Sequence, residues 1–520
     1  MLRRVLKMVF LMIGLVIAVL ITAHLVYRPP SLEGRTISQA VEASPSTPLG
    51  RLALNRPGQE EGDSGVIPLI DGPEAFAARV ALIRSARVAL DVQYYIWQRD
   101  ATGLMLLDEV RKAAERGVRV RLLLDDNGIR NLDDDLAALA ALPGVEVRLF
   151  NPFVLRTLKP LGYLFDFVRL NRRMHNKSLT ADGAVSILGG RNIGDIYFGF
   201  GSGVQFIDTD VIVTGRVTAD IGADFDAYWH SGSSHPIGRL VEEPGQGALE
   251  QLIADARQAA TSDEGQRYLD WLARSNLVMQ MVAGELTFEW TDVALISDDP
   301  AKGQGEADLN DLLFPQLMEL LARPSHSIDL ASAYFVPGRQ FTDALMRLAQ
   351  DGIRVRILTN SLAATNHAIV HSAYVKYRPH LLQAGIELYE LKPAFAAEDE
   401  DYVRDLTGSS RVTLHSKTLA ADEQRIFIGS FNFDPRSFLL NTEMGVVIDS
   451  PRMASALAAA FVNDFPQMSY VPELIGEDAL VWKEPQLDGP EIRHEAEPGM
   501  DRLSRLLLWF FGLLPIEWLL

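Results

Sequence analysis

The residues of this sequence best suited to chemistry lie in two copies of one short motif. Each copy has the spacing His-x-Lys-x4-Asp, and each residue of the second copy follows its counterpart by 240 positions. The segments after the copies also match, Leu188-Gly-Gly-Arg-Asn192 against Ile428-Gly-Ser-Phe-Asn432. Matching flanks at a constant offset exclude a chance pattern, so we predict a duplicated functional site. The six motif residues are His175, Lys177, Asp182, His415, Lys417 and Asp422.

The motif spacing suits the chemistry of a phosphodiester. Residues two apart on a strand point to the same face, so the His and Lys of each copy project together. If two lobes are related by a pseudo-twofold axis, two imidazoles and two ammonium groups meet. The lysines would neutralise the phosphoryl oxygens, one imidazole would attack phosphorus, and the other would protonate the leaving alkoxide. Asn192, Asn432, Arg436 and Ser437 are candidate phosphate ligands, with a salt bridge at a turn as the alternative role of Arg436 and Ser437.

A nucleophilic histidine requires a neutral ring that is held by a carboxylate on its other nitrogen. The segments Asp208-Thr-Asp210 and Asn441-Thr-Glu443 follow the two motifs. Alignment through the shared Thr pairs Asp210 with Glu443, and we predict that these two orient the histidines, with Asp208 as a reserve candidate. The aspartates within the motifs, Asp182 and Asp422, are predicted to stabilise a turn.

The mechanism needs no metal or other cofactor, and we predict none. His367 and His371 lie four apart on an expected helix, but no third ligand accompanies them. Lining of the substrate cleft is one interpretation of this pair, and ordinary packing or capping is the other. Tyr94 and Tyr334 occupy similar positions at strand ends, where core packing is the default prediction and an edge of the pocket is the alternative.

An internal repeat supplies the elements that position these residues. Segments 88–95 and 328–335, 240 positions apart, predict matching strands. Each leads through a helical stretch that ends in Gly to a second strand, 118–124 or 353–358. Apolar strands that alternate with helices are typical of β-α-β units on a buried sheet. We therefore predict an α/β fold of two similar lobes, each a mixed β-sheet flanked by helices, related by a pseudo-twofold axis.

The rest of the chain is assigned around these lobes. A further strand is predicted near 293–296, within a region that has no match in the other half. The predicted organisation is an N-terminal membrane anchor (1–30), a linker (31–65), a first lobe (66–235), a helical insertion and connection (236–310), a second lobe (311–470), and a C-terminal tail with a membrane-interface segment (471–520).

Composition excludes several classes of protein. The 520 residues are 48% hydrophobic and 22% charged, a globular balance that excludes disordered, collagenous and coiled-coil chains. The formal charge of −19 disfavours a general nucleic-acid binder, which would present a basic face. The chain has no Cys, so disulfides, thiolate metal sites and cysteine nucleophiles are excluded.

Both ends of the chain indicate contact with a membrane. Three basic residues precede the apolar run 8–27, and about 20 helical residues cross a ~30 Å hydrocarbon core. We predict a transmembrane anchor with its amino end in the cytoplasm and the body outside. A cleaved signal peptide is the alternative, but Thr22-Ala-His24 is a poor cleavage site. The C-terminal segment 503–520 is too short to span, and its Trp509 and Trp518 suit a helix at the lipid interface. Docking of this segment on the protein's own core is the alternative.

The duplicated motif resembles that of the phospholipase D superfamily, over about residues 66–470. The resemblance implies a two-lobed fold, one shared active site and a phosphohistidine intermediate, with His175 as the nucleophile and His415 as the acid and base. The first copy departs from the pattern, because Arg191-Asn-Ile-Gly-Asp195 replaces the Asn-Phe-Asp-Pro-Arg-Ser form, so an equivalent of Arg436 is not evident there. Four segments are similar to C-type bacterial cardiolipin synthases: Leu-Leu-Leu-Asp-Asp-Asn127-Gly, Thr359-Asn-Ser-Leu-Ala-Ala-Thr-Asn366-His367, Gly429-Ser-Phe-Asn-Phe-Asp-Pro-Arg436-Ser437 and Leu514-Pro-Ile-Glu-Trp518-Leu-Leu.

This resemblance also implies a reaction and a location. A phosphatidyl group would pass from phosphatidylglycerol or phosphatidylethanolamine to a histidine, and phosphatidylglycerol would then accept it to form cardiolipin. A hydrolytic phospholipase D that releases phosphatidic acid is one alternative, and a non-catalytic membrane protein that binds anionic lipids is another. The implied location is the bacterial inner membrane, with the body on the periplasmic side, and a small accessory protein would assist the C-type group.

Overall fold

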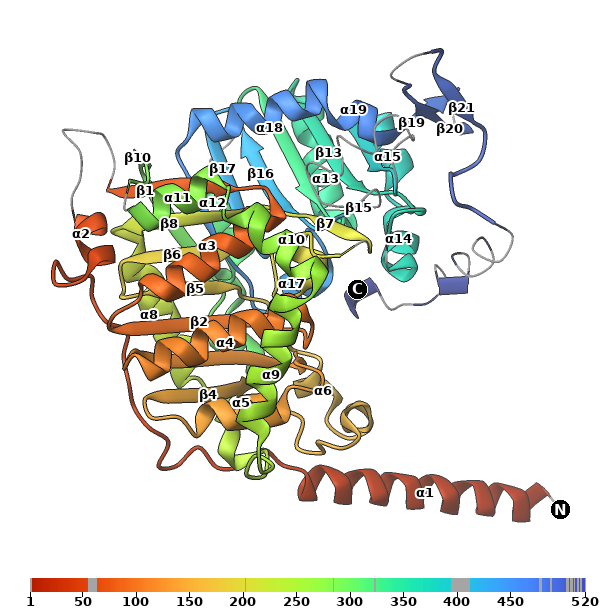
Figure 1. Cartoon of the computed structure of the whole chain (residues 1–520). Helices are drawn as coiled ribbons and strands as arrows, with labels where there is room; N and C mark the ends of the chain where they lie inside the picture. Colours follow the sequence, from red (N-terminus) through yellow and green to blue (C-terminus); the bar gives the residue numbers. More distant parts are fainter. Residues whose placement is uncertain are drawn as a thin grey trace.

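The chain folds into two α/β lobes that pack side by side, as the computed structural model in Figure 1 shows. The structure describes residues 2–54, 63–201, 203–283, 285–321, 324–365, 367–393, 412–476, 479–486 and 489–501, together with isolated residues of the segment 505–519. Each lobe is built on one mixed sheet with helices against it. The predicted fold class is confirmed.

The first lobe contains a nine-stranded sheet. Strands β2, β3 and β4 pair in parallel, and the remaining pairs are antiparallel. The order across the sheet is β10 (Glu289–Thr291), β1 (Ser64–Leu69), β8 (Asp210–Gly215), β6 (Val185–Gly189), β5 (Ser178–Ala181), β2 (Ala89–Ile96), β3 (Arg119–Gly128), β4 (Val145–Phe150) and β9 (Ser234–Pro236). The helices packed in this half are α2 (Pro48–Leu54), α3 (Gly72–Ser85), α4 (Ala101–Glu115), α5 (Asp133–Ala140), α6 (Phe167–Leu170), α7 (Asp195–Phe198), α8 (Val217–His230), α9 (Ala248–Thr261), α10 (Asp263–Leu272) and α11 (Asn276–Ala283).

The second lobe repeats the central strand order of the first. Six strands, β18-β17-β16-β12-β13-β14, correspond to β8-β6-β5-β2-β3-β4. The full sheet is β11 (Val293–Ser297), β18 (Met444–Ile448), β17 (Arg425–Gly429), β16 (Lys417–Ala421), β12 (Ser327–Ser332), β13 (Arg354–Asn360), β14 (Glu387–Leu391), β19 (Ser469–Ile475), β20 (Ala479–Glu484) and β21 (Ile492–His494). Its helices are α12 (Leu313–Leu320), α13 (Gly338–Gln350), α14 (Ala368–Tyr374), α15 (Arg378–Gln383), α17 (Pro435–Leu439), α18 (Pro451–Asn463) and α19 (Phe465–Met468).

The strand repeat has a different offset from the motif repeat. Asp91 pairs with Arg121 across β2 and β3, and Asp329 pairs with Arg356 across β12 and β13, each at 2.6 Å between buried side chains. These equivalent pairs place the two strands 238 positions apart (329 − 91), whereas the motif histidines are 240 apart. The predicted match of 88–95 with 328–335 is therefore wrong by two residues, because the second half holds two more residues between strand and motif.

Apolar packing and strand pairing join the two lobes. One buried cluster draws Val66, Leu188 and Val211 from the first lobe and Ile428 and Val446 from the second. In addition, β7 (Gln205–Ile207) pairs in parallel with β15 (Val412–Leu414). The region 236–310 also serves both lobes, because β10 extends the first sheet and β11 the second, and β11 contains the strand predicted near 293–296.

The segments outside the predicted lobes are more ordered than the predicted boundaries imply. Within the predicted linker, Ser38 O accepts a hydrogen bond from Arg121 (3.0 Å) and Ala40 N donates to Asp226, so this stretch is attached to the first lobe. Strands β19, β20 and β21 extend the second sheet through 494, so the first half of the predicted tail is sheet. Farther on, Glu497 is buried in an ion pair with Arg378 and a hydrogen bond with His371.

The N-terminal helix α1 (Leu2–Val26) projects from the first lobe (Figure 1). It has a mean hydropathy of 2.8 over an 18-residue window and none of its residues is buried. Within the part of the chain that the structure describes, it is the helix long and apolar enough to cross a membrane.

Candidate active site

The two motif histidines meet at the interface between the lobes, where each is held by the other lobe. His175, just before β5, donates its backbone N–H to Thr442 O in the second lobe at 2.8 Å. His415, just before β16, donates its backbone N–H to Ile207 O in the first lobe at 2.7 Å. The side chains of His175 and His415 are 8% and 7% exposed. The duplicated motifs therefore form one site, and neither lobe can position its histidine alone.

Each imidazole also bonds to a carboxylate that the opposite lobe supplies. His175 Nδ1 lies 2.7 Å from Glu443 Oε2, and His415 Nδ1 lies 2.6 Å from Asp208 Oδ2. A carboxylate that accepts from Nδ1–H leaves the lone pair of a neutral ring on Nε2. With its lone pair on Nε2, each ring could attack an electrophile or accept a proton.

The prediction that Asp210 orients a histidine is wrong. Asp210 accepts hydrogen bonds from Arg79 (2.8 Å) and from the backbone N–H of Arg191 (3.0 Å), both buried. Asp208, the reserve candidate, occupies the position equivalent to Glu443.

The register of the strands explains this correction. Gly190 N donates to Thr209 O in the first lobe, and Ser430 N donates to Met444 O in the second. These equivalent bonds align Thr209 with Met444, and therefore Asp208 with Glu443. The two Thr residues used for the sequence alignment, Thr209 and Thr442, are not structurally equivalent.

The two lysines lie beside their histidines and are buried. Lys177 Nζ donates to His175 O, and Lys417 Nζ donates to His415 O and lies 3.0 Å from His415 Nδ1. Burial, which disfavours the ammonium form, lowers the pKa of Lys177 to about 7 and of Lys417 to about 8. The nearby carboxylate of Glu443 opposes that shift for Lys177. A bound phosphodiester anion would favour the charged form of both groups.

Burial and the adjacent lysines keep both imidazoles neutral. Burial, together with Lys177 and Lys417, holds the pKa of His175 well below its usual value. The same two causes, burial first, lower the pKa of His415 to about 3, against the attraction of Asp208. Burial raises the pKa of Glu443 to about 7, an effect that Lys177 partly offsets. In the absence of substrate, both imidazoles are therefore mostly uncharged at neutral pH.

The predicted phosphate ligands differ in their surroundings. Asn192 is fully buried, with Oδ1 accepting from Ile96 N (3.1 Å) and Nδ2 donating to the Tyr197 hydroxyl (3.0 Å). Asn432 is 5% exposed, and its Oδ1 has no hydrogen-bond partner in the described part of the chain. The side-chain oxygen of Asn192 is therefore occupied by a bond within the protein, whereas that of Asn432 is not.

Arg436 and Arg191 have different roles in the fold. Arg436 donates to both oxygens of Asn171 (3.0 and 3.1 Å) and to Leu519 O (3.1 Å), so it joins α17 to the first lobe and to the C-terminal segment. Ser437 is the next residue, and its backbone N–H donates to the side chain of Asp434, which caps the N-terminus of α17. Arg191 donates instead to the backbone carbonyls of Leu69 and Ile70, at the end of β1, and to that of Asp208. These different partners exclude Arg191 as a structural equivalent of Arg436.

Asp182 and Asp422 lie in the turns after β5 and β16, away from the imidazoles. Asp182 accepts from the backbone N–H groups of 87, 88 and 89, and Asp422 from those of 325, 326 and 327. Both have a left-handed backbone, with φ of 53° and 56°. Asp tolerates this conformation through local hydrogen bonds, so this geometry favours a role in the turn.

Three aromatic side chains that contact the histidines were missed from the sequence. The Tyr95 ring lies 4.9 Å from His175, the Phe206 ring is stacked 4.9 Å from His415, and the Tyr197 ring lies edge-on to His415 at 5.2 Å. Tyr94, by contrast, is in the core, where its hydroxyl accepts from Arg79. Strand alternation could have separated Tyr95 from Tyr94, since adjacent residues face opposite ways.

The two members of the other predicted pair, His367 and His371, have different neighbours. The His367 ring contacts Tyr334 at 5.3 Å, and His371 is buried against Glu497. Among the residues that the structure describes, no cluster of His, Cys, Asp and Glu could hold a metal ion.

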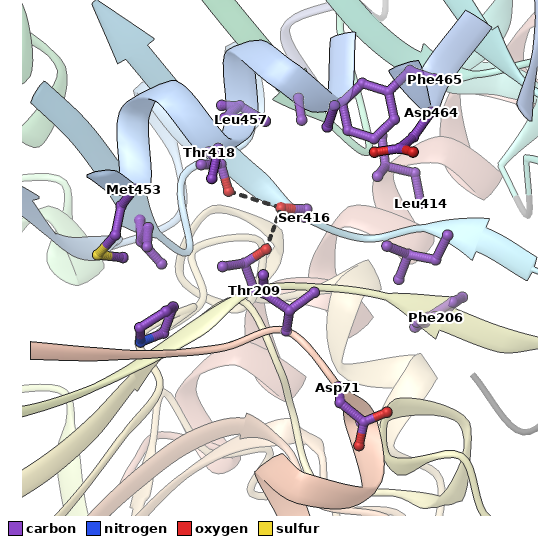
Figure 2. Close-up of a pocket in the computed structure, with 18 of the residues that line it drawn as sticks. Asp71, Phe206, Thr209, Leu414, Ser416, Thr418, Met453, Leu457, Asp464 and Phe465 are labelled. Carbon is purple, nitrogen blue, oxygen red and sulfur yellow. Dashed lines mark hydrogen bonds between the residues drawn. The ribbon is translucent and has the colours of Figure 1, made fainter. Parts of the chain in front are cut away.

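A separate apolar cavity of about 660 Å³ lies between the lobes (Figure 2). Leu414 and Ser416, which flank His415 in the chain, line it together with Phe206 and Leu457. The Ser416 hydroxyl bonds there to Thr209 and Thr418 (Figure 2). Because neighbouring residues of an extended chain face opposite ways, this cavity lies behind the strand that carries the catalytic candidates.

Comparisons with known proteins agree with this geometry. Residues 80–229 and 317–465 each match the family model described as "Cardiolipin synthase, PLD-like domain". Cardiolipin synthase C of Escherichia coli (strain K12) is 44% identical over 462 residues, which cover 89% of this chain and 97% of that protein. A cardiolipin synthase of Staphylococcus aureus (strain N315) is 26% identical over 398 residues, 76% of this chain and 66% of that protein.

A solved structure shows the same fold at greater distance. The crystal structure of phosphatidylserine synthase from Haemophilus influenzae Rd KW20 superposes with a TM-score of 0.56 and 14% identity. The match covers 88% of this chain and 95% of that one, so the likeness extends over both lobes.

Proposed function

This chain belongs to the cardiolipin synthase family of phospholipase D-like proteins, and from that premise we propose that it is a phosphatidyltransferase that makes cardiolipin. The acceptor is phosphatidylglycerol, and the donor is phosphatidylglycerol or phosphatidylethanolamine. The observation that carries the proposal is the composite site: two neutral imidazoles, each bonded to a carboxylate of the opposite lobe, with two buried lysines beside them.

The first step forms a phosphohistidine. His175 Nε2 attacks the phosphorus of the donor lipid, because Glu443 holds the proton of the ring on Nδ1. The bond from phosphorus to the headgroup oxygen breaks, and His415 gives that oxygen a proton. Because His415 is neutral in the free site, its Nε2 first takes up a proton from solvent when the anionic lipid binds, and Asp208 and the charge of the bound phosphodiester stabilise the imidazolium that forms. Lys177 and Lys417 neutralise the phosphoryl oxygens, whose charge grows in the transition state.

The second step reverses the roles of the groups. A terminal hydroxyl of phosphatidylglycerol loses its proton to His415 Nε2 and attacks phosphorus. The phosphorus–nitrogen bond to His175 breaks, cardiolipin leaves, and both imidazoles return to their starting state. The histidine–carboxylate bonds, 2.7 Å at His175 and 2.6 Å at His415, are nearly equal and do not distinguish the nucleophile from the acid. We therefore assign His175 as the nucleophile from the resemblance to the superfamily.

Hydrolysis is the competing outcome of the same intermediate. Water in place of the lipid hydroxyl would yield phosphatidic acid. The burial of both histidines favours transfer, because a site closed to bulk solvent admits little water until a second lipid arrives.

The test is lipid mass spectrometry on the purified protein in membranes of phosphatidylglycerol and phosphatidylethanolamine, beside His175→Ala and His415→Ala. Cardiolipin from the wild type and from neither variant supports the proposal, and omission of each lipid in turn identifies the donor. Phosphatidic acid as the main product would make the protein a hydrolase. Unchanged cellular function of His175→Ala would instead favour a non-catalytic lipid-binding protein.

The proposed location follows from α1. We assign it as an uncleaved anchor in the bacterial inner membrane, with the lobes on the periplasmic side, because basic residues precede the apolar run. Protease treatment of intact spheroplasts tests this orientation, since only a periplasmic body would be digested. A small accessory protein belongs to the proposal through the C-type resemblance, and its addition should then raise the rate of the purified chain.

A further inference from the structure

A group of apolar side chains is exposed at one end of the first lobe, around η1 (Lys159–Leu164) and α6. Their exposed fractions range from 42% to 67%, although large apolar side chains in a row are normally buried. We call this group the entrance patch. It consists of Leu158, Leu161, Leu164, Phe167 and Val168.

The entrance patch lies directly beside the end of the membrane helix. Phe165, in the middle of the patch, stacks on Tyr27 with ring centroids 5.5 Å apart. His24 Nδ1, in the last turn of α1, lies 3.0 Å from Phe165 O. In Figure 1, α6 lies in the part of the first lobe from which α1 projects. If α1 crosses the bilayer, these contacts hold the patch at the bilayer surface.

A chain of contacts leads from the patch to the catalytic histidine. The Tyr163 hydroxyl donates to Asn127 Oδ1 at 3.3 Å, and Asn127 Nδ2 donates to the Tyr95 hydroxyl at 3.3 Å. The Tyr95 ring then lies against His175. On the other side, Asn171, one residue past α6, bonds to Arg436. The patch is therefore at the edge of the site and not on a remote surface.

The charges around the patch also suit an anionic membrane. In a protein with a net charge of −19, the acidic groups at this edge have basic partners. Asp166 pairs with Arg169 at 2.6 Å, and Asp126 pairs with Lys159 at 2.9 Å and with Arg156. Paired carboxylates repel anionic headgroups much less than free ones do.

We propose that the entrance patch inserts into the bilayer beside α1 and is the place where lipid enters the active site, past Tyr163 and Tyr95. The inference rests on the proposed function, because an enzyme that draws its substrates from a membrane needs the edge of its site at the lipid surface. Insertion would bring the scissile phosphate to the catalytic groups without exposing the acyl chains to water.

Placement of the patch can be tested on the full chain, because the protein has no Cys. Leu164→Cys and, as a matched control, Val462→Cys are each labelled with an environment-sensitive fluorophore. Both native side chains are apolar and about equally exposed, 65% and 64%, but Val462 lies on α18 at the opposite end of the molecule (Figure 1). The probe is a vesicle of phosphatidylglycerol and phosphatidylethanolamine that contains spin-labelled lipid.

We expect the spin label to quench the fluorophore at 164 at least threefold more than the one at 462. Equal quenching at the two positions would overturn the proposal. This readout requires no catalysis, so it stands even if the wild type makes no cardiolipin and the proposed function fails.

A pair of charge variants tests the role of the patch in turnover. Leu164→Asp combined with Val168→Asp should lower cardiolipin formation on vesicles at least tenfold, with an unchanged thermal unfolding curve, because carboxylates resist insertion. Val462→Asp should stay within twofold of the wild type. Wild-type rates in the folded double variant would refute entry at the patch.

Discussion

Asp208 and Asp210 lie two positions apart, and the structure gives them different tasks. Asp208 bonds to the ring of His415, whereas Asp210 bonds to Arg79. The matched substitutions Asp208→Asn and Asp210→Asn change each side chain by the same single group. We expect the first to impair turnover and the second to impair stability.

The expected size of each effect follows from the contacts. The bond from His415 Nδ1 to Asp208 is 2.6 Å long and buried, and a hydrogen bond to a charged group contributes ~1.5–3 kcal/mol. Each increment of about 1.36 kcal/mol in the barrier changes the rate tenfold, so kcat should fall about 10- to 150-fold, with little change in KM. Loss of the Asp210 charge leaves Arg79, which is 1% exposed, without its counterion. Breaking a buried pair costs ~3–5 kcal/mol, which corresponds to a fall in Tm of about 10 °C.

The assay is the initial rate of cardiolipin formation from isotopically labelled phosphatidylglycerol in vesicles, read by mass spectrometry, beside thermal unfolding of the same samples. Glu443→Gln gives the matching test at His175 and should resemble Asp208→Asn. A folded Asp208→Asn variant with wild-type kcat, together with an inactive but folded Asp210→Asn variant, would refute the assignment of the orienting carboxylates.

Three further predictions concern other parts of the molecule. Burial lowers the pKa of Lys177 to about 7 and of Lys417 to about 8, and only their ammonium forms neutralise phosphate. The value of kcat/KM should therefore fall as the pH rises through 7 to 8. A profile of kcat/KM that stays flat to pH 9 would contradict this. Deletion of 501–520 should lower transfer more than hydrolysis in lipid mass spectrometry, because Leu519 is bound to Arg436 near the site, and equal loss of both would exclude a role in favouring the lipid acceptor. Asp182→Ala should destabilise the fold by about 2–3 kcal/mol in denaturant unfolding, because three backbone N–H groups lose their acceptor, while kcat of the folded fraction changes less than threefold. A large loss of kcat without loss of stability would instead place Asp182 in the chemistry.

The amino-acid sequence alone was enough to predict the two lobes, the α/β class and the apolar N-terminal helix. Two kinds of signal made this feasible. Hydrophobic periodicity reports local structure, and a motif repeated at a constant offset reports duplication. The pairing of His with Lys on one face also follows from the two-residue period of an extended chain, so His175 and Lys177 needed no tertiary information.

Which side chains complete the site was decided only by the tertiary structure. His175 bonds to Glu443 and His415 bonds to Asp208 across the lobe interface, between residues more than 200 positions apart. Alignment by a shared Thr chose Asp210, because register depends on which backbone groups pair, and the segment 190–208 is five residues longer than its equivalent 430–443. The same limit hid Tyr95, Phe206 and the entrance patch. Local pattern sets which way a side chain faces within its own element, but the packing of distant elements determines what it meets there.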